Sequence, residues 1–180
     1  NEANVALKLT LLTSSSPATY PLVAEQIREQ WRSLGVEVHV VIPTDRSEFE
    51  RRVIERDYDL LLFGQPLLDN LDSYPFWHSS QTQGTPKEEK TLKLDANNLS
   101  QYRSFEADTL LQQIRETRNP DLRREYLEQL EQVFRRDVPA IVLYAPMYLF
   151  GVRENILGVN LGSPSLHSDR FLGIHRWFIK

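Results

Sequence analysis

The sequence predicts an α/β fold built on a strand–helix–strand–helix–strand unit. Three observations lead to this fold class. Apolar residues alternate or run continuously over 5–12, 36–41 and 58–63, as is typical of strands. The two segments between these runs carry apolar residues at helical spacing, and the connecting turns are short. This order of elements favours parallel strands joined by right-handed crossovers.

The first strand is predicted from the alternation of apolar residues over 5–11. A serine-rich turn follows, and we expect Ser16, placed before Pro17, to cap the next helix. The helix ends at Gly35, a residue type that readily adopts positive φ. Its predicted apolar stripe consists of Tyr20, Val23, Ala24, Ile27, Trp31 and Leu34.

The second strand is predicted over 36–41, where valines alternate with other residues. Ser47 and Glu50 have the spacing of a capping box, which predicts the start of a short helix. The apolar side of that helix carries Phe49, Val53 and Ile54. A third strand is expected over 58–63, and its apolar run 60–63 has the length of a strand buried on both faces.

A polar segment and two amphipathic helices follow the strand–helix unit. The segment 82–99 predicts a long surface loop. The two helices are expected to be capped by Ser104 and by Asn119, the latter followed by Pro120 at the first helical position. Their apolar stripes are Phe105, Ala107, Leu110, Leu111 and Ile114 in the first, and Leu122, Tyr126, Leu127, Leu130, Val133 and Phe134 in the second.

The last part of the chain has weaker patterns. Val138 and Pro139 are expected to end the second amphipathic helix. Residues 140–145 and 147–152 are strand-like, and 177–179 is a candidate for a short terminal strand. The predicted fold is therefore a parallel βαβαβ core with further helices and a C-terminal strand.

The composition excludes several classes of function. A hydrophobic content of 41% and a charged content of 26% are ordinary for a globular domain. The net charge of −4, with scattered lysines and arginines, argues against nucleic-acid binding. The absence of cysteine excludes disulfides and thiolate metal sites. No apolar run reaches the roughly 18 residues of a membrane span.

The sequence gives little support for catalysis. No two histidines have the i, i+4 spacing of a zinc-binding helix, and no dinucleotide-binding or P-loop motif occurs. His78 and Ser79, near Asp72, could suggest a hydrolase, but the G-x-S-x-G elbow is absent. We therefore expect a protein that is not an enzyme, with no metal and no cofactor.

The loop after Gly64 is the clearest candidate for a ligand site, because ligands of open α/β sheets bind beyond the carboxyl ends of the strands. A carboxylate of Asp69 or Asp72 could hold an ammonium or hydroxyl group there. Asp72 could equally cap the turn at Ser73, and the aromatic residues could pack inward. The prolines and aromatics of this loop are Pro66, Pro75, Tyr74, Phe76 and Trp77.

Five segments of the chain, taken in order, resemble the motifs of one family. They are Leu34-Gly35-Val36-Glu37-Val38; Asp57-Tyr58-Asp59 with Gly64; Asp72 with Phe76-Trp77-His78-Ser79; Asn98 and Tyr102 with Asp108-Thr109-Leu110-Leu111; and Asp137-Val138-Pro139 with Leu143-Tyr144. The chain thus resembles the C-terminal lobe of the family 5 extracellular solute-binding proteins. These are the oligopeptide- and dipeptide-binding components of ABC importers.

This resemblance implies a periplasmic-binding-protein-like (type II) C-terminal lobe over residues 1–180, as a fragment of a longer two-lobed protein. Residues 153–180 would be a tail that returns toward the missing N-terminal lobe. The implied function is capture of a solute such as a peptide for the membrane permease of an ABC importer. The full-length protein would be extracellular or periplasmic and anchored as a lipoprotein. The alternative is a ligand-sensing domain of a transcriptional or signalling regulator.

The resemblance also implies which residues would touch the solute. Gln65 would exchange a hydrogen bond with it, and Asp69 or Asp72 would meet a positive group. Tyr74 or Tyr102 would pack against an apolar face. The remaining residues of the implied site are Tyr20 and Pro66. Each of these side chains could instead serve packing, and one lobe alone is expected to bind a solute weakly or not at all.

The chain departs from the family where the site is expected. After the strand-ending glycine the family often places a Trp, followed by an Asp that can grip a peptide amino terminus. Here that place is Gln65-Pro66-Leu67-Leu68, and the first acid is Asp69.

Overall fold

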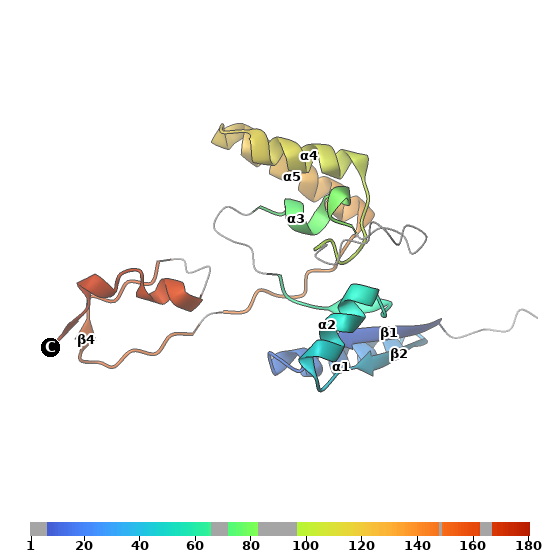
Figure 1. Ribbon diagram of the computed structural model, residues 1–180, viewed down its shortest axis with the longest axis horizontal. Coiled ribbons are helices and arrows are strands. Elements are labelled where there is room, and N and C mark those ends of the chain that lie inside the picture. The colour runs from blue at the N-terminus through green and yellow to red at the C-terminus, as the bar shows by residue number, and fades with distance from the viewer. Residues whose placement is uncertain (1–6, 66–71, 83–96, 148, 163–166) are drawn as a thin grey trace, which may run out of the picture. The chain divides into compact units, whose positions relative to one another are not determined.

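The computed structural model describes residues 7–65, 72–82, 97–147, 149–162 and 167–180, with only the backbone of His167 (Figure 1). The chain divides into two compact units, Asn1–Gln65 and Pro66–Lys180. Each unit is described by itself. The predicted surface loop falls largely on 83–96, outside the described residues.

The first unit contains the predicted strand–helix–strand–helix–strand order. Its elements are β1 (Leu7–Thr13), α1 (Thr19–Arg32), β2 (Val36–Val41), α2 (Arg46–Glu55) and β3 (Leu60–Leu62). The strands form a sheet of order β2-β1-β3, and both pairings are parallel. The predicted parallel βαβαβ core is therefore confirmed.

Helix α1 packs on the sheet through small and branched apolar side chains. Leu11 of β1, Ala24 of α1 and Val38 of β2 are buried together, and Ile27 and Trp31 pack around them. Gly35 has φ +82°, so the predicted glycine at the end of α1 is confirmed.

The expectation that the run 60–63 is buried on both faces is wrong. In the described sheet β3 is an edge strand, its leucines are half-buried, and Phe63 is 48% exposed. The strand is also shorter than predicted, because at Asp59 a side-chain carboxylate takes the place of a backbone carbonyl as hydrogen-bond acceptor for β1. Its backbone N–H donates to the carbonyl of Thr10 at 3.0 Å, and its carboxylate accepts from the N–H of Thr10 at 2.7 Å.

The first unit also corrects two predicted caps. Helix α1 begins after Ala18 with no side-chain cap, so Ser16 lies too early in the chain to cap it. Helix α2 is capped by Asp45, whose carboxylate accepts from the N–H of Ser47 at 3.1 Å. Ser47 thus lies inside the first turn, because the carboxylate two residues earlier already occupies the cap position.

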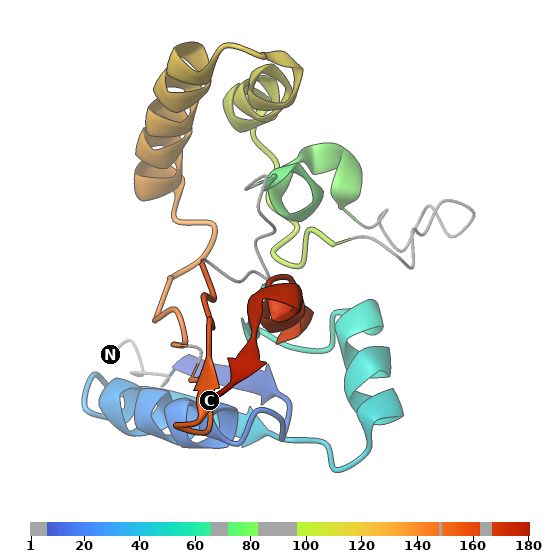
Figure 2. The ribbon, with the colours of Figure 1, turned by 90° about the vertical axis from the view of Figure 1, so that its left-hand side faces the viewer.

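The second unit begins with a helical region, residues 72–137. Its helices are α3 (Tyr74–Trp77), the 3-10 helix η1 (Ser79–Gln81), α4 (Phe105–Glu116) and α5 (Pro120–Asp137). Helices α4 and α5 form a hairpin, with α3 beside α4 (Figure 2). The predicted caps are confirmed: Ser104 accepts from the N–H of Ala107, and Asn119 accepts from that of Asp121.

The core of the helical region lies between α4 and α5. Its buried members are Ala107, Leu110, Leu111, Ile114, Leu130 and Val133. Phe105 does not belong to the stripe as predicted, because it lies at the first helical position and is 89% exposed. Leu122, near the start of α5, is also partly exposed at 42%.

The predicted strands over 140–145 and 147–152 are wrong, because the described residues of this segment form no regular secondary structure. A strand needs a neighbour for its backbone hydrogen bonds, and none is described for it here. The tail contains a two-stranded antiparallel pair, β4 (Ile156–Leu157) with β5 (Phe178–Ile179), which confirms the short terminal strand. The 3-10 helices η3 (His167–Phe171) and η4 (Ile174–Arg176) lie between them in the chain. Of the helices described, none has the length and apolar character of a membrane span.

Candidate functional site

The carboxyl ends of β1 and β3 mark the place where this sheet can bind a ligand. From β1 the chain leads through α1 to β2 on one side, whereas β3 lies on the other side of β1. In open α/β sheets, ligands bind beyond the carboxyl ends of the strands at such a switch in direction. The hydroxyl of Thr13, fully buried, donates to the carbonyl of Leu62 at 3.0 Å and ties the two strand ends together.

Tyr20 lies directly against Gly64, two residues after the end of β3. A Cβ atom placed on Gly64 would come within 2.2 Å of the Tyr20 hydroxyl oxygen. A side chain at this position would push the end of the tyrosine side chain aside, so the glycine permits this close approach. Gln65 follows at once and, like Tyr20, is half-buried. The structure thus brings two of the predicted site residues, Tyr20 and Gln65, to one edge of the sheet.

Asp72 already meets a positive group of its own unit. Its carboxylate accepts from Arg115 Nε at 2.9 Å and lies 2.8 Å from Arg115 Nη2. It also accepts from the N–H of Tyr74 at 3.2 Å, so it caps a turn as in the packing alternative. The Asp72 side chain is 19% exposed. Its charge is therefore largely balanced inside the helical region.

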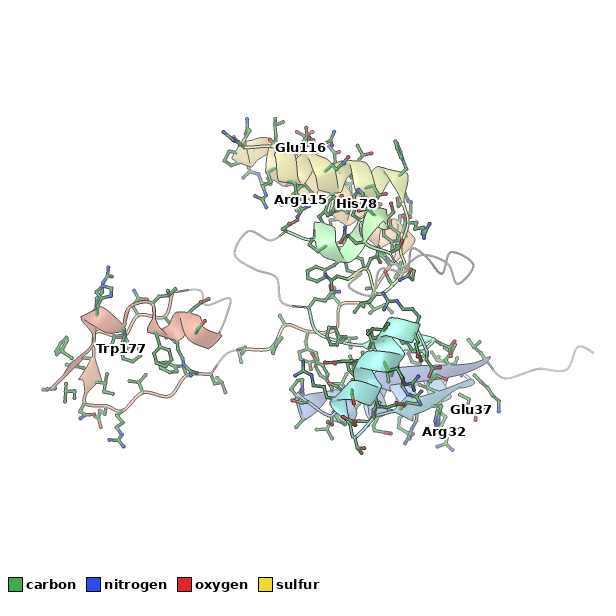
Figure 3. The ribbon with its side chains drawn as sticks, in the orientation of Figure 1. Arg32, Glu37, His78, Arg115, Glu116 and Trp177 are labelled. Atoms are coloured by element: carbon green, nitrogen blue, oxygen red, sulfur yellow. The ribbon has the colours of Figure 1, made fainter. Side chains whose placement is uncertain are left out.

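The ring of Tyr74 packs against two neighbours in the helical region. His78, labelled in Figure 3, stacks on it with ring centroids 4.1 Å apart. The guanidinium of Arg115, also labelled there, lies 4.2 Å from the ring centroid. The Tyr74 hydroxyl lies 3.3 Å from Ser80 Oγ. These contacts give Tyr74 a packing role within the helical region.

Tyr102 makes a different set of contacts. Its hydroxyl donates to Asp137 Oδ2 at 2.5 Å, and its ring meets the edge of Phe134 with centroids 5.8 Å apart. Burial, and then the hydrogen bond to Asp137, raises the pKa of Tyr102. Hydrogen bonds from Arg136 and from Tyr102 lower the pKa of Asp137 below its ordinary value. These contacts join the loop before α4 to the end of α5.

The two remaining predicted site residues, Pro66 and Asp69, lie outside the described residues. The structure therefore gathers Tyr20 with Gln65 in the first unit, and Asp72 with Tyr74 around Arg115 in the second.

The geometry of Ser79 does not suit a hydrolase. Its hydroxyl donates to a carboxylate oxygen of Asp108, and its backbone N–H donates to the other at 2.8 Å. His78 Nδ1 accepts from the N–H of Ser80 at 3.0 Å, and so caps η1. A nucleophilic serine instead donates its proton to a histidine that acts as base. The Phe-Trp-His-Ser segment thus has a structural role here.

Asn98 is the central polar residue of the helical region, and residue types alone did not single it out. It is fully buried, and its amide nitrogen lies within 3.2 Å of the carbonyls of Trp77, His78 and Tyr102. Its carbonyl oxygen accepts from the N–H of Tyr102 and from Ser100. The only sequence signal for it was its place in a family-like motif.

Two other features bear on the kind of site. In the described ranges no cluster of three or more His, Asp or Glu side chains could hold a metal ion. A groove of about 370 Å³ runs between α1 and β2 and includes Arg32 and Glu37 (Figure 3). It lies at the end of α1 and the start of β2, the edge opposite to the switch point.

The parallel sheet, its switch point and the attached helices define the class of fold: it is that of a lobe of a substrate-binding protein. Among solved structures, the oligopeptide-binding protein AppA of Bacillus subtilis, in complex with a nonapeptide, matches with a TM-score of 0.72. It is 22% identical, and the match covers 100% of this chain and 34% of that protein. The fold implied by the sequence resemblance is thereby confirmed.

Two further solved structures show the same fold. A putative peptide-binding protein AppA of Clostridium difficile matches with a TM-score of 0.70 and 16% identity, over 98% of this chain and 34% of that one. NikZ of Campylobacter jejuni, in complex with Ni(L-His), matches with a TM-score of 0.64 and 20% identity, over 95% and 33%. The chain therefore spans about a third of the length of these proteins. No protein-family model and no curated protein matches it.

Proposed function

We propose that the chain is one lobe of a two-lobed solute-binding protein that captures peptides for an ABC-type importer and catalyses no reaction. The observation that carries the proposal is the fold shared with an oligopeptide-binding protein over the whole chain, together with the switch point of the sheet, where Tyr20 lies against Gly64. In this proposal the solute lies between this lobe and an N-terminal lobe. Closure of the two lobes excludes water and strengthens each polar contact.

Exposed apolar residues after α5 support the proposal of a longer protein. Ile141 is 68% exposed, Val142 90%, Met147 86% and Leu149 86%. Such a run of exposed apolar residues on extended backbone marks a surface that another element covers. We assign that element to the N-terminal lobe, toward which residues 153–180 would also return.

The roles of the site residues follow from their partners. Tyr20, Gln65 and Pro66 would contact the solute directly. Because Asp72 is paired with Arg115, Asp69 is the carboxylate that we assign to a positive group of the solute. Tyr74 and Tyr102 would support the site through their packing.

The cellular setting belongs to the same proposal. One neighbour is described as an ABC transporter-associated periplasmic binding protein, in complex with the peptide STSA; it matches with a TM-score of 0.63 and 15% identity, over 97% of this chain and 31% of that one. By analogy the full-length protein would be extracellular or periplasmic, anchored as a lipoprotein, and would deliver its solute to a membrane permease.

Mass spectrometry of the ligand carried by the full-length protein tests this function. The protein would be purified without added solute and unfolded in acid, and the released molecules would be identified. Intact peptides are expected. A nickel chelate, or no small molecule combined with no peptide binding in titration calorimetry, would contradict the proposal. The Ser79→Ala variant should carry the same peptides, whereas a role in hydrolysis would change the peptides recovered.

A further inference from the structure

Strand β2 is an edge strand of the described sheet. In the order β2-β1-β3 it pairs with β1 alone among the residues that the structure describes, and its six residues include four valines. The other edge strand, β3, has only three residues. A row of unpaired backbone N–H and C=O groups along an edge strand is a template on which a further strand can pair. Of the two edges, β2 offers the longer template.

The side chains of β2 alternate between two faces of the sheet. Val38 is 5% exposed and is buried with Ala24 of α1, and Val36 and Val40 pack around the same cluster. The two residues between these valines, Glu37 and His39, belong to the other face and are exposed. The strand thus has an apolar face toward α1 and a polar face that carries one acid and one imidazole.

This pattern is complementary to itself when two copies of β2 run antiparallel with Val38 opposite its own copy. Val36 of one copy then faces Val40 of the other, so the apolar face continues from sheet to sheet. Glu37 faces His39 of the second copy, and the contact occurs twice because of the two-fold symmetry. A carboxylate opposite an imidazole N–H is a favourable cross-strand pair.

The exposed side of α1 has the same kind of symmetry. Its charged residues alternate in sign along the helix, in the order Glu25, Arg28, Glu29, Arg32. Three of them, from Arg28 on, line the groove that also includes the start of β2 (Figure 3). In the two-fold pair the copies of α1 run antiparallel, which places Arg28 opposite Glu29 and Arg32 opposite Glu25. Unlike charges therefore meet along the whole row.

We propose that β2 pairs antiparallel with β2 of a second copy of this chain, joining the two sheets of the first units into one continuous sheet. The inference goes beyond solute capture and does not depend on it. The occupant is a second copy because the valines of β2, its Glu37 and His39, and the charges of α1 are all complementary to themselves. Pairing of one short strand buries little surface, so a weak and reversible dimer is expected.

Sedimentation velocity of the full-length protein at neutral pH tests this pairing. The protein is measured from about 1 µM to about 500 µM, the range in which a small, transient interface dissociates. His39→Glu places two carboxylates opposite each other in both contacts, and the double variant Glu37→Lys/His39→Glu restores opposite charges. Gln112→Glu is the matched control, because it adds a carboxylate on the exposed side of α4, away from β2. Thermal unfolding checks that each variant is folded.

The unchanged protein should shift from monomer to dimer over this range. His39→Glu should raise the Kd of the dimer at least about fivefold, because two like-charge contacts replace two favourable ones. The double variant should return the Kd to within about twofold of the unchanged protein, and Gln112→Glu should leave it the same. A monomer at every concentration, or a dimer that His39→Glu does not weaken, would overturn the inference. So would a double variant that stays as weak as His39→Glu.

Hydrogen exchange of the unchanged protein gives a second test that needs no variant. Amides of β2 should exchange more slowly at the high protein concentration than at the low one, because the second copy accepts their outward hydrogen bonds. Amides of α4 and α5 should exchange at the same rate at both concentrations. Slower exchange confined to elements other than β2 and α1 would place the contact elsewhere and refute the pairing.

Discussion

The sheet edge of the first unit and the helical region 72–137 carry different kinds of polar side chains. In the helical region polar groups bond to one another: Asp72 to Arg115, Ser79 to Asp108, and Tyr102 to Asp137. In the described turns at the sheet edge (14–20, 42–44 and 63–65) the polar side chains are hydroxyls and the amide of Gln65. The difference shows that an acid or an aromatic near a strand end is not by itself a binding residue. What matters is whether the same unit already supplies its partner.

The largest predicted effect is on the helical region. Asn98→Ala leaves the carbonyls of Trp77, His78 and Tyr102 without the amide to which they bond, in a fully buried place. We expect the free energy of unfolding of this region to fall by about 3–5 kcal/mol. Hydrogen exchange should then show α4 and α5 losing protection while β1 and β2 keep theirs.

The matched control is Asn119→Ala, which removes only the cap of α5 and should cost about 1 kcal/mol. If Asn98→Ala also exposed the amides of β1 and β2 to exchange, the sheet and the helical region would unfold together. The comparison between them would then be wrong.

The sequence predicted well what depends on neighbours in the chain. The caps Ser104 and Asn119 and the strand β2 were found because each pattern is local. Ser16 and Ser47 were misjudged as caps because the start of a helix depends on which residue turns the backbone, and several candidates lie within a few positions. The strands expected over 140–152 failed because a strand needs a partner, which periodicity does not reveal.

The site was harder to predict than the fold, since its partners are distant in the chain. Arg115, which pairs with Asp72, is 43 residues away from it. Asn98 lies 21 and 20 residues from two of the carbonyls that it holds. The contact of Tyr20 with Gly64 follows from the parallel pairing of β1 with β3, which the sequence predicted. The sequence did not indicate which polar residues near this edge pair with distant residues of the chain.

A smaller effect is predicted at the sheet edge. Gly64→Ala places a methyl group 2.2 Å from the Tyr20 hydroxyl oxygen, and relieving this overlap should cost about 1–2 kcal/mol of unfolding free energy. In the Tyr20→Phe background the nearest remaining ring atom is 3.6 Å away, an ordinary contact, and the cost should disappear. Urea unfolding of the four proteins measures the coupling. Equal costs in both backgrounds would mean that Tyr20 does not lie over Gly64.

The smallest predicted effect returns to the helical region and appears only as a pH dependence. Arg136 and Tyr102 lower the pKa of Asp137 in the folded state, whereas in the unfolded chain it stays near its ordinary value of 3.8. The unfolded chain therefore takes up the proton first as the pH falls, so the stability contributed by Asp137 is present above about pH 3.8 and is lost below it. Asp137→Asn should be less stable than the unchanged protein at pH 7, and urea midpoints measured between pH 7 and pH 3 should converge at the acid end. Tyr102→Phe removes one of the two hydrogen bonds that lower the pKa of Asp137. In that background, Asp137→Asn should lower the urea midpoint at pH 7 by less, and the difference should again disappear in acid. If the difference in urea midpoint between the unchanged protein and Asp137→Asn grew in acid, the carboxylate would be destabilising in the folded state. The hydrogen bonds from Arg136 and Tyr102 would then not balance its charge.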